Sequence, residues 1–262
     1  MEVRTILTPA EIAALHAGDL RGATCVVFDV LRATSTILAA LANGARSVRP
    51  VLTPEEAFAV QTERLPGALL GGERGGVRID GFDLGNSPRE YTAAIVAGRD
   101  IITTTTNGTV ALRACGGADR VFVAALSNLD ATAARLRALR PNQVWLVCAG
   151  TGADFALEDG LAAGGLAARL EEPGLRGDDA TAAMRALYDH HRGDLAAALA
   201  DSSNGRRLFR IDLGEDVAWC ARESWLDAVA VMEAGAVRLA QNPLPESLPV
   251  ANDGLPPTSN ME

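Results

Sequence analysis

The stretch TCVVFDVLRATST, Thr24 to Thr36, joins an apolar run to a polar segment that opens with a carboxylate. The residues before Asp29 suit a strand that is buried in a sheet. Asp29 ends this run, and Arg32 follows three residues later. A carboxylate at the end of a buried strand is costly to desolvate unless it is paired or faces a cation. The stretch therefore predicts a buried strand whose end brings a cation and an anion together.

Apolar runs of this kind alternate with helical patterns through the first two-thirds of the chain. The expected strands cover 24–30, 47–52, 68–72, 100–106, 121–126 and 144–150. Helical patterns lie between them, the clearest over 34–45, 53–65 and 128–140. Such alternation is typical of a mainly parallel sheet with helices on both faces. We therefore expect a three-layer α/β/α fold.

The chain from Leu157 onward is predicted to form a helical C-terminal part. Its helical patterns and one further apolar run cover 157–172, 178–191, 194–209 and 227–232. No linker is evident before residue 240, so we expect a single α/β domain over residues 1–240. Residues 241–262 are rich in Pro, Ser and Asn, which predicts a mobile tail.

Composition excludes several classes of protein. The net charge of −9 disfavours nucleic acid as a partner, because phosphates demand a basic stripe. No apolar run approaches the roughly 18 residues of a membrane helix. The first residues, MEVRTILTPAEIAAL, do not resemble a signal peptide. We expect a cytoplasmic protein with no membrane partner, and a homo-oligomer is left open.

Lysine is missing from the chain, so all 24 basic residues are arginines. This excludes a Walker-type phosphate loop and a lysine Schiff base. The three histidines offer little material for a zinc site, and the four cysteines form no CxxC pair. A bound anion would therefore meet arginine forks and backbone N–H groups, with or without a metal ion.

Polar residues follow most of the expected strands, where parallel sheets bind their ligands. They are Asp29 and Arg32, Glu73 and Arg74, Asn107, Ser127 and Asn128, and Thr151. Each also has an ordinary structural interpretation. Asp29 could cap the next helix or pair with Arg32, and Glu73 with Arg74 could form a surface salt bridge in a solvated loop.

Three further stretches carry groups suited to an anionic ligand. In GGERGGVRIDGFDLGNSPREY, 71–91, two Gly-Gly pairs flank Glu73-Arg74 within a long loop, and such loops are more often functional than idle. In TTTTNGTVAL, 103–112, Asn-Gly-Thr opens a helix with uncharged donors.

The third of these stretches, VCAGTGADFALEDGLAAG, 147–164, brings Glu158 and Asp159 to the start of a helix. Acids in a first helical turn ordinarily complement the helix dipole. Together with Asp29 and Glu73, they could instead complete an Mg²⁺ site made of oxygen ligands.

These four stretches, taken in order, resemble the 2-phosphosulfolactate phosphatase family. The likeness runs from about residue 24 to 165, and the helical part beyond it fits loosely. It implies an Mg²⁺-dependent phosphatase associated with coenzyme M biosynthesis in methanogens, with homologues in bacteria. The implied reaction hydrolyses the phosphate monoester of an α-hydroxy acid, foremost (R)-2-phospho-3-sulfolactate, to 3-sulfolactate and phosphate.

The resemblance also implies roles for individual residues. Metal-binding and catalytic roles are carried to Asp29, Glu73 and Asp159, and anion binding to Arg32 and Arg74. Weaker candidates for oxygen contacts to the substrate are Thr34, Ser35, Thr105, Asn107 and Thr151. Two routes stay open: a water activated at the cation attacks phosphorus with a carboxylate as base, or Asp29 itself attacks and forms an aspartyl-phosphate.

Three other interpretations fit the sequence to different degrees. A haloacid-dehalogenase-type phosphatase needs a second Asp two residues after the first, where Leu31 stands, and a downstream lysine. A non-catalytic binder of an anionic metabolite would gain nothing from carboxylates among its arginines. A related phosphatase for another 2-phospho hydroxy acid remains compatible with every motif.

Overall fold

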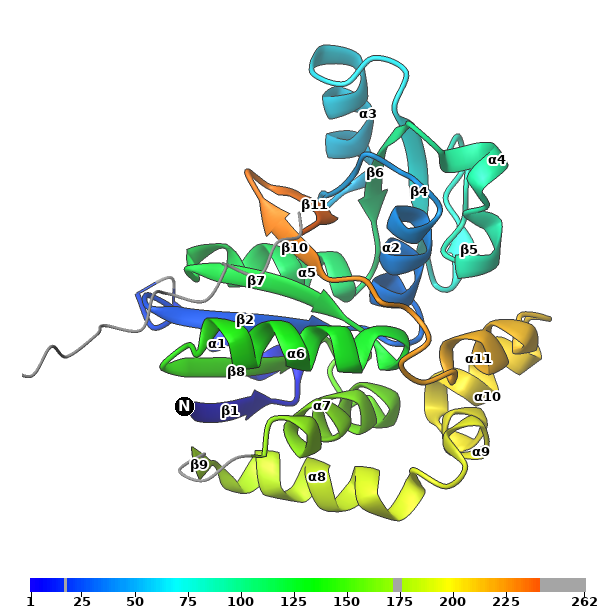
Figure 1. The fold of residues 1–262 in the computed structure, drawn as a ribbon. Coiled ribbons are helices and arrows are strands. Elements are labelled where there is room, and N and C mark those ends of the chain that lie inside the picture. Colours follow the sequence, from blue (N-terminus) through cyan, green and yellow to red (C-terminus); the bar gives the residue numbers. More distant parts are fainter. Residues whose placement is uncertain (17, 172–175, 241–262) are drawn as a thin grey trace, which may run out of the picture.

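The computed structural model describes residues 1–16, 18–171 and 176–240, and its strands join in one mixed sheet (Figure 1). The strand order is β5-β4-β6-β3-β11-β10-β7-β2-β8-β1-β9. The strands are β1 (Glu2–Ile6), β2 (Ala23–Phe28), β3 (Ser47–Pro50), β4 (Leu69–Arg74), β5 (Val77–Arg78), β6 (Asp100–Thr104), β7 (Arg120–Ala124), β8 (Gln143–Cys148), β9 (Arg176–Gly177), β10 (Ala230–Glu233) and β11 (Ala236–Leu239).

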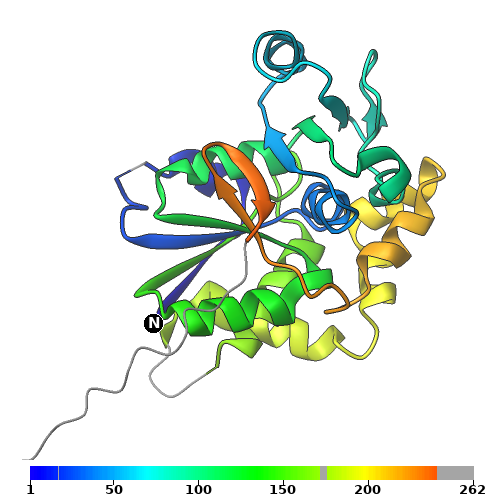
Figure 2. The ribbon, with the colours of Figure 1, turned by 45° about the horizontal axis from the view of Figure 1, so that its top comes forward.

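The sheet consists of two parallel sets of strands joined by an antiparallel hairpin. Strands β7, β2, β8, β1 and β9 form one set, and β3, β6 and β4 form the other, with the short β5 antiparallel to the end of β4. The β10–β11 hairpin pairs antiparallel with β7 on one side and with β3 on the other. Figure 2 shows this orange hairpin between the two sets. In Figure 1, β4 and β6 run steeply across the direction of β2, β7 and β8.

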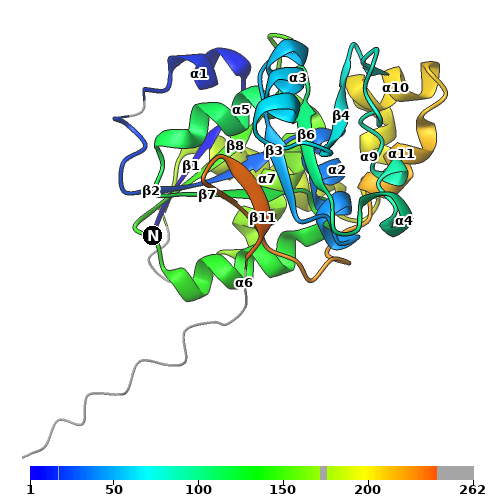
Figure 3. The same cartoon turned by 90° about the horizontal axis from the view of Figure 1, so that it is seen from above.

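Helices cover both faces of the sheet, as the alternating pattern predicts. They are α1 (Pro9–Ala14), α2 (Ala33–Ala42), α3 (Pro54–Glu63), α4 (Ala93–Val96), α5 (Gly108–Ala114), α6 (Leu129–Leu139), α7 (Leu157–Arg169), α8 (Asp179–His191), α9 (Leu195–Asp201), α10 (Ser203–Arg210) and α11 (Gly214–Cys220), with short 3₁₀ turns at Pro88–Glu90, Cys115–Gly117 and Leu126–Asn128. In Figure 3, α1 and α5 lie on one side of the strands and α6 on the other. The predicted α/β class with a mainly parallel sheet and helical C-terminal part is confirmed.

The helix ends follow the sequence signals closely. Thr53 accepts a hydrogen bond from the Glu56 N–H at 3.1 Å and so caps α3, with Pro54 at its first position. The helix expected over 194–209 is in fact two helices. They separate at Ser202, whose hydroxyl accepts the Gly205 N–H at 2.9 Å and starts α10.

Several elements were not expected from the sequence. They are β1, β5, β9, β11, α1, α4 and α11. Strand β1 pairs in parallel with β8, and β11 is the hairpin strand that reaches β3. The strand expected over 227–232 begins only at Ala230. The predicted tail, 241–262, and the last residue of the helix expected over 157–172 lie outside the described residues.

The main apolar core lies between the β1–β2–β7–β8 part of the sheet and the helices that cover it. A smaller cluster around Val51, Leu70 and Ile102 lies where α3 packs on the second set of strands. All four cysteines are buried and unbridged. Among the described residues, no helix combines the length and apolarity needed to cross a membrane.

Candidate active site

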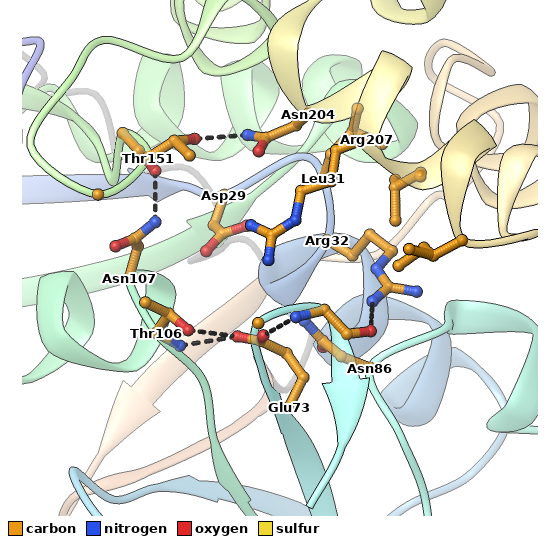
Figure 4. A pocket seen from close by; sticks show the side chains of 16 residues that line it. Asp29, Leu31, Arg32, Glu73, Asn86, Thr106, Asn107, Thr151, Asn204 and Arg207 are labelled. Carbon is orange, nitrogen blue, oxygen red and sulfur yellow. Dashed lines mark hydrogen bonds between the residues drawn. The ribbon is translucent and has the colours of Figure 1, made fainter.

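A cavity of about 290 Å³ opens where the ends of β2, β4, β6 and β8 converge (Figure 4). Each of these strand ends contributes polar residues to its wall. Asp29 and Arg32 follow β2, Thr106 and Asn107 follow β6, and Thr151 follows β8, while Glu73 is near the end of β4. Further wall comes from Gly75, Gly76 and Asn86, after β4, and from α10 with the residue that follows it. The expectation that polar groups gather at the carboxyl ends of the strands is met for these four strands, whereas Ser127 and Asn128, which follow β7, do not line the cavity.

Asp29 both caps the next helix and faces the cavity, so it combines the two roles that the sequence left open. Its Oδ1 accepts the Ala33 N–H at 3.0 Å, and its own N–H donates to Thr34 Oγ1 at 3.0 Å, so it caps the start of α2. Its Oδ2 has no hydrogen-bond partner among the described residues, and the side chain lines the cavity. Burial raises the pKa of Asp29 to about 7; the Ala33 N–H opposes this rise, and the charge of Glu73 adds to it.

Glu73 joins two of the converging segments. Its Oε1 accepts the backbone N–H and the hydroxyl of Thr106, at 2.8 and 2.9 Å. Its Oε2 accepts the Gly76 N–H at 2.6 Å, which is within reach because Gly75 and Gly76 turn with positive φ of 64° and 84°. Three hydrogen bonds thus fix this carboxylate at the cavity wall.

Arg32 lines the cavity, but its charge is already matched. Its Nη1 forms an ion pair with Asp216 Oδ2 at 2.7 Å, and its Nη2 donates to the Gly76 carbonyl at 3.0 Å. Asp216, on α11, is fully buried, and its other oxygen accepts the Ser87 hydroxyl at 2.7 Å. Sequence analysis missed Asp216, because an acid in a first helical turn has an ordinary explanation in the helix dipole.

Asp159 is buried close to the site and does not line the cavity. Its Oδ1 accepts the Val30 N–H at 2.8 Å, and its Oδ2 accepts the Gly150 N–H at 3.1 Å. It therefore ties the segment after β2 to the segment after β8. Burial, with the charges of Asp29 and Glu158, raises the pKa of Asp159 well above its ordinary value.

The three carboxylates predicted to hold a metal are not brought together. Asp29 and Glu73 face the cavity, whereas both oxygens of Asp159 accept backbone N–H groups. Within the described ranges, no three His, Cys, Asp or Glu side chains are grouped so as to hold an ion. Oxygen ligands for Mg²⁺ would thus come from two carboxylates at most, which still fits a cation that relies on water and substrate phosphate.

Arg74 also lies away from the cavity. Its guanidinium donates to the Glu73 carbonyl at 2.8 Å, to the Leu52 carbonyl at 3.0 Å and to Thr104 Oγ1 at 2.9 Å. These contacts tie the end of β4 to its neighbours in the sheet. The structure does not bring Arg74 to the other residues expected to bind an anion.

The predicted hydroxyl and amide contacts divide into two groups. Thr34, Ser35 and Thr105 are buried and bond to the backbone of their own turns; for example, Ser35 donates to the Val30 carbonyl at 2.8 Å. Asn107 and Thr151 line the cavity. Asn107 Nδ2 donates to the Gly150 carbonyl at 2.9 Å, and Thr151 Oγ1 accepts from Asn204 at 2.5 Å.

The wall formed by α10 was not predicted. Asn204, Arg207, Leu208 and Ile211 lie at helical spacing and turn one face toward the cavity. The sequence does carry a signal, because Ser202-Ser203-Asn204-Gly205 is a helix-start pattern within the expected helix. Splitting the helix there would have drawn attention to Arg206 and Arg207, although not to the face that meets the site.

Comparison with known proteins gives one consistent result. The family model described as 2-phosphosulpholactate phosphatase matches residues 7–235. A probable 2-phosphosulfolactate phosphatase of Symbiobacterium thermophilum is 44% identical over 228 residues, which span 86% of this chain and 97% of that protein. Proteins with the same description from Gloeobacter violaceus and Thermotoga petrophila are 42% and 40% identical, over 81% and 84% of this chain and 89% and 93% of their own lengths.

Proposed function

Since the chain belongs to the 2-phosphosulpholactate phosphatase family, we propose that it hydrolyses the phosphate monoester of an α-hydroxy acid. The first candidate substrate is (R)-2-phospho-3-sulfolactate, which would give 3-sulfolactate and phosphate. The proposal extends the relatives' printed activity to this chain. A role in coenzyme M biosynthesis stays a prediction.

The observation that carries this proposal is the mixture of charges around the cavity. Asp29 and Glu73 supply carboxylates, Arg32 and Arg207 supply guanidinium groups, and Asn107 and Thr151 supply neutral polar atoms. A phosphate ester that also bears a carboxylate and a sulfonate is a polyanion, and arginine forks bind such oxyanions. Carboxylates in the same cavity suit a reaction at phosphorus better than simple anion binding.

We propose Mg²⁺ as the cofactor, with Glu73 as the carboxylate that would hold it and Asp29 beside it. Mg²⁺ is often bound by one or two carboxylates, and waters and substrate phosphate complete its shell. When bound, it would offset the charge of the phosphate and make phosphorus more open to attack. Asp159 is left out of this set, because it does not line the cavity.

For the chemical step we propose attack by water on phosphorus, with Asp29 taking the proton. The new P–O bond comes from water, the P–O bond to the hydroxy acid breaks, and solvent returns a proton to the leaving alkoxide. Asp29 suits this role because its Oδ2 accepts no hydrogen bond among the described residues. A pKa of about 7 also places its proton transfer near neutral pH.

The first test is phosphate release from 2-phosphosulfolactate and 2-phospholactate, with Mg²⁺ and with EDTA, for wild type and Asp29→Asn. Steady release that needs Mg²⁺ and collapses in the variant supports the proposal. A folded wild-type protein that binds both esters without releasing phosphate would instead be a binder of anionic metabolites. Faster turnover of 2-phospholactate would favour a phosphatase for another 2-phospho hydroxy acid.

The alternative chemical route, attack by Asp29 itself, needs a separate measurement. A substrate analogue whose phosphorus is made chiral with sulfur and oxygen isotopes, turned over in isotope-labelled water, distinguishes the two routes. Inversion of configuration in the released thiophosphate supports direct attack by water, which is a single displacement. Retention of configuration, which needs two displacements, shows an aspartyl-phosphate and excludes the water route.

A further inference from the structure

Arg207 is the cavity arginine whose charge is not matched by the protein. Arg32 is paired with the buried Asp216 at 2.7 Å. Arg207 is exposed, lines the cavity, and forms no hydrogen bond or ion pair within the part of the chain that the structure describes. A guanidinium directed into a polar cavity without a counter-ion is available to an anionic ligand.

The helix that carries Arg207 is held firmly against the strand ends. One turn earlier, Asn204 Nδ2 donates to Thr151 Oγ1 at 2.5 Å and to Glu158 Oε1 at 2.6 Å. Ser202 caps the start of the helix, where its Oγ accepts a hydrogen bond from the Gly205 N–H at 2.9 Å. Because Asn204 and Arg207 are three residues apart, they share a face, and this anchoring sets where the guanidinium stands.

The same helix face is apolar beyond Arg207. Leu208 and Ile211 line the cavity, and Leu31 lines it as well. The groups suited to phosphate chemistry, Asp29 and Glu73, come from the strand ends. Figure 4 shows Arg207 reaching from α10 into the cavity. The α10 wall therefore offers a carbon-lined surface with one cationic group, which suits the organic part of an ester.

We propose that Arg207 binds the acidic group on the alcohol part of the substrate, a carboxylate or a sulfonate, and not the phosphate that is cleaved. This inference rests on the proposed function. It makes α10 the element that selects phosphate esters of hydroxy acids over esters of uncharged alcohols. Arg207 is then a residue for specificity, and its contact with the substrate is lost when the alcohol bears no acid.

The test compares kcat/KM for 2-phosphosulfolactate, 2-phospholactate and p-nitrophenyl phosphate in wild type, Arg207→Ala and Arg207→Lys. Loss of a charge-assisted contact predicts that Arg207→Ala lowers kcat/KM about 10- to 100-fold for the two acid-bearing esters. The value for p-nitrophenyl phosphate should stay unchanged, and Arg207→Lys should restore part of the loss. Arg210→Ala is the matched control, because Arg210 is exposed on the same helix and does not line the cavity.

The three esters also show which acidic group of the substrate Arg207 binds. A loss confined to 2-phosphosulfolactate assigns Arg207 to the sulfonate, whereas equal losses for both acid-bearing esters assign it to the carboxylate. An equal loss for p-nitrophenyl phosphate would place Arg207 on the phosphate and overturn the inference. No loss for any ester would overturn it too.

The inference can also be tested without turnover. Calorimetry measures the affinity of wild type and Arg207→Ala for 3-sulfolactate and for inorganic phosphate. Arg207→Ala should weaken binding of 3-sulfolactate about 10- to 100-fold and leave inorganic phosphate unchanged. If wild type binds 3-sulfolactate more tightly than Arg207→Ala does but hydrolyses no ester, the proposed function is contradicted and the role of Arg207 is still supported. Equal affinity of wild type and variant for 3-sulfolactate, including no binding by either, would overturn that role.

Discussion

Gly108, the first residue of α5, lies directly against the carboxylate of Asp29. A Cβ atom at position 108 would stand 2.6 Å from Asp29 Oδ2 and 2.5 Å from the Cβ of Ala33. Both distances are well inside van der Waals contact, so no side chain fits there without movement of the neighbours. The glycine of the Asn-Gly-Thr motif is thus required by the close approach of α5 to the segment that follows β2.

Gly108→Ala is expected to displace Asp29 and lower kcat on the order of 10²-fold, because a shift of about 1 Å at a reacting group has that effect. The protein should remain folded, since alanine is a better helix former than glycine. Phosphate release and circular dichroism measure the two effects. Gly116→Ala is the control, because a Cβ there meets nothing within 4 Å. Full activity of Gly108→Ala would mean that the position of Asp29 is not critical.

The raised pKa of Asp29 predicts a dependence of stability on pH. Between its ordinary value of 3.8 and about 7, the folded protein holds a proton on Asp29 that the unfolded chain has released. The free energy of unfolding should therefore fall as pH rises through this window. Each pKa unit corresponds to about 1.4 kcal/mol, so the fall should reach a few kcal/mol.

Denaturant unfolding of wild type and Asp29→Asn in EDTA, at intervals from pH 4 to pH 8, measures this effect. The variant should be more stable than wild type at pH 8, and the difference should shrink toward pH 4. The difference between the two proteins isolates Asp29 from the other carboxyls. Parallel curves over the whole range would show that Asp29 titrates normally in the folded protein.

Asp216→Asn should destabilise the protein more strongly than most surface substitutions. It leaves the buried guanidinium of Arg32 without a counter-ion, and breaking a buried pair costs roughly 3–5 kcal/mol. Glu215→Gln is a matched control, because Glu215 pairs with Arg89 at the exposed surface, where such pairs contribute about 0–1 kcal/mol. Chemical denaturation measures both, and similar losses for the two variants would contradict the importance of the buried pair.

Glu73→Gln should loosen the turn between β4 and β5. The two carboxylate oxygens accept three hydrogen bonds, so an amide nitrogen at either position faces a donor. We expect a loss of about 1–3 kcal/mol in the free energy of unfolding and lower phosphatase activity. Thr106→Val removes only the hydroxyl donor and should cost less, about 1 kcal/mol. A Glu73→Gln protein as stable as wild type would show that these bonds add little.

The sequence was informative where local patterns suffice. Apolar runs located β2, β3, β4, β6, β7 and β8, and the rule for parallel sheets placed Asp29 and Glu73 at one cavity. The β10–β11 hairpin was harder to predict from the sequence, because β11 is short and its link to β3 rests on the pairing of Val237 with Val48. No local pattern indicates that a distant hairpin joins two sets of strands.

Side-chain direction accounts for most of the remaining differences at the site. Asp159 comes after β8 and Arg74 ends β4, yet Asp159 accepts backbone N–H groups and Arg74 donates to two carbonyls and to Thr104. Spacing along the chain says which residues are near a strand end, but not which of them face the ligand. Arg207 and Asp216 were missed for a different reason. Both belong to helices far along the chain from the four motifs, and there Arg207 lines the cavity and Asp216 pairs with Arg32.

The pairing of Arg32 with Asp216 spans 184 positions of the chain. A polypeptide that ended near residue 165 would contain all four sequence motifs, yet it would lack the counter-ion of Arg32 and the α10 wall. During synthesis from the N-terminus, Arg32 therefore gains its buried partner only after α11 has been made. The capacity to bind substrate thus belongs to the last stage of chain assembly, although the motifs that identify the family belong to the first.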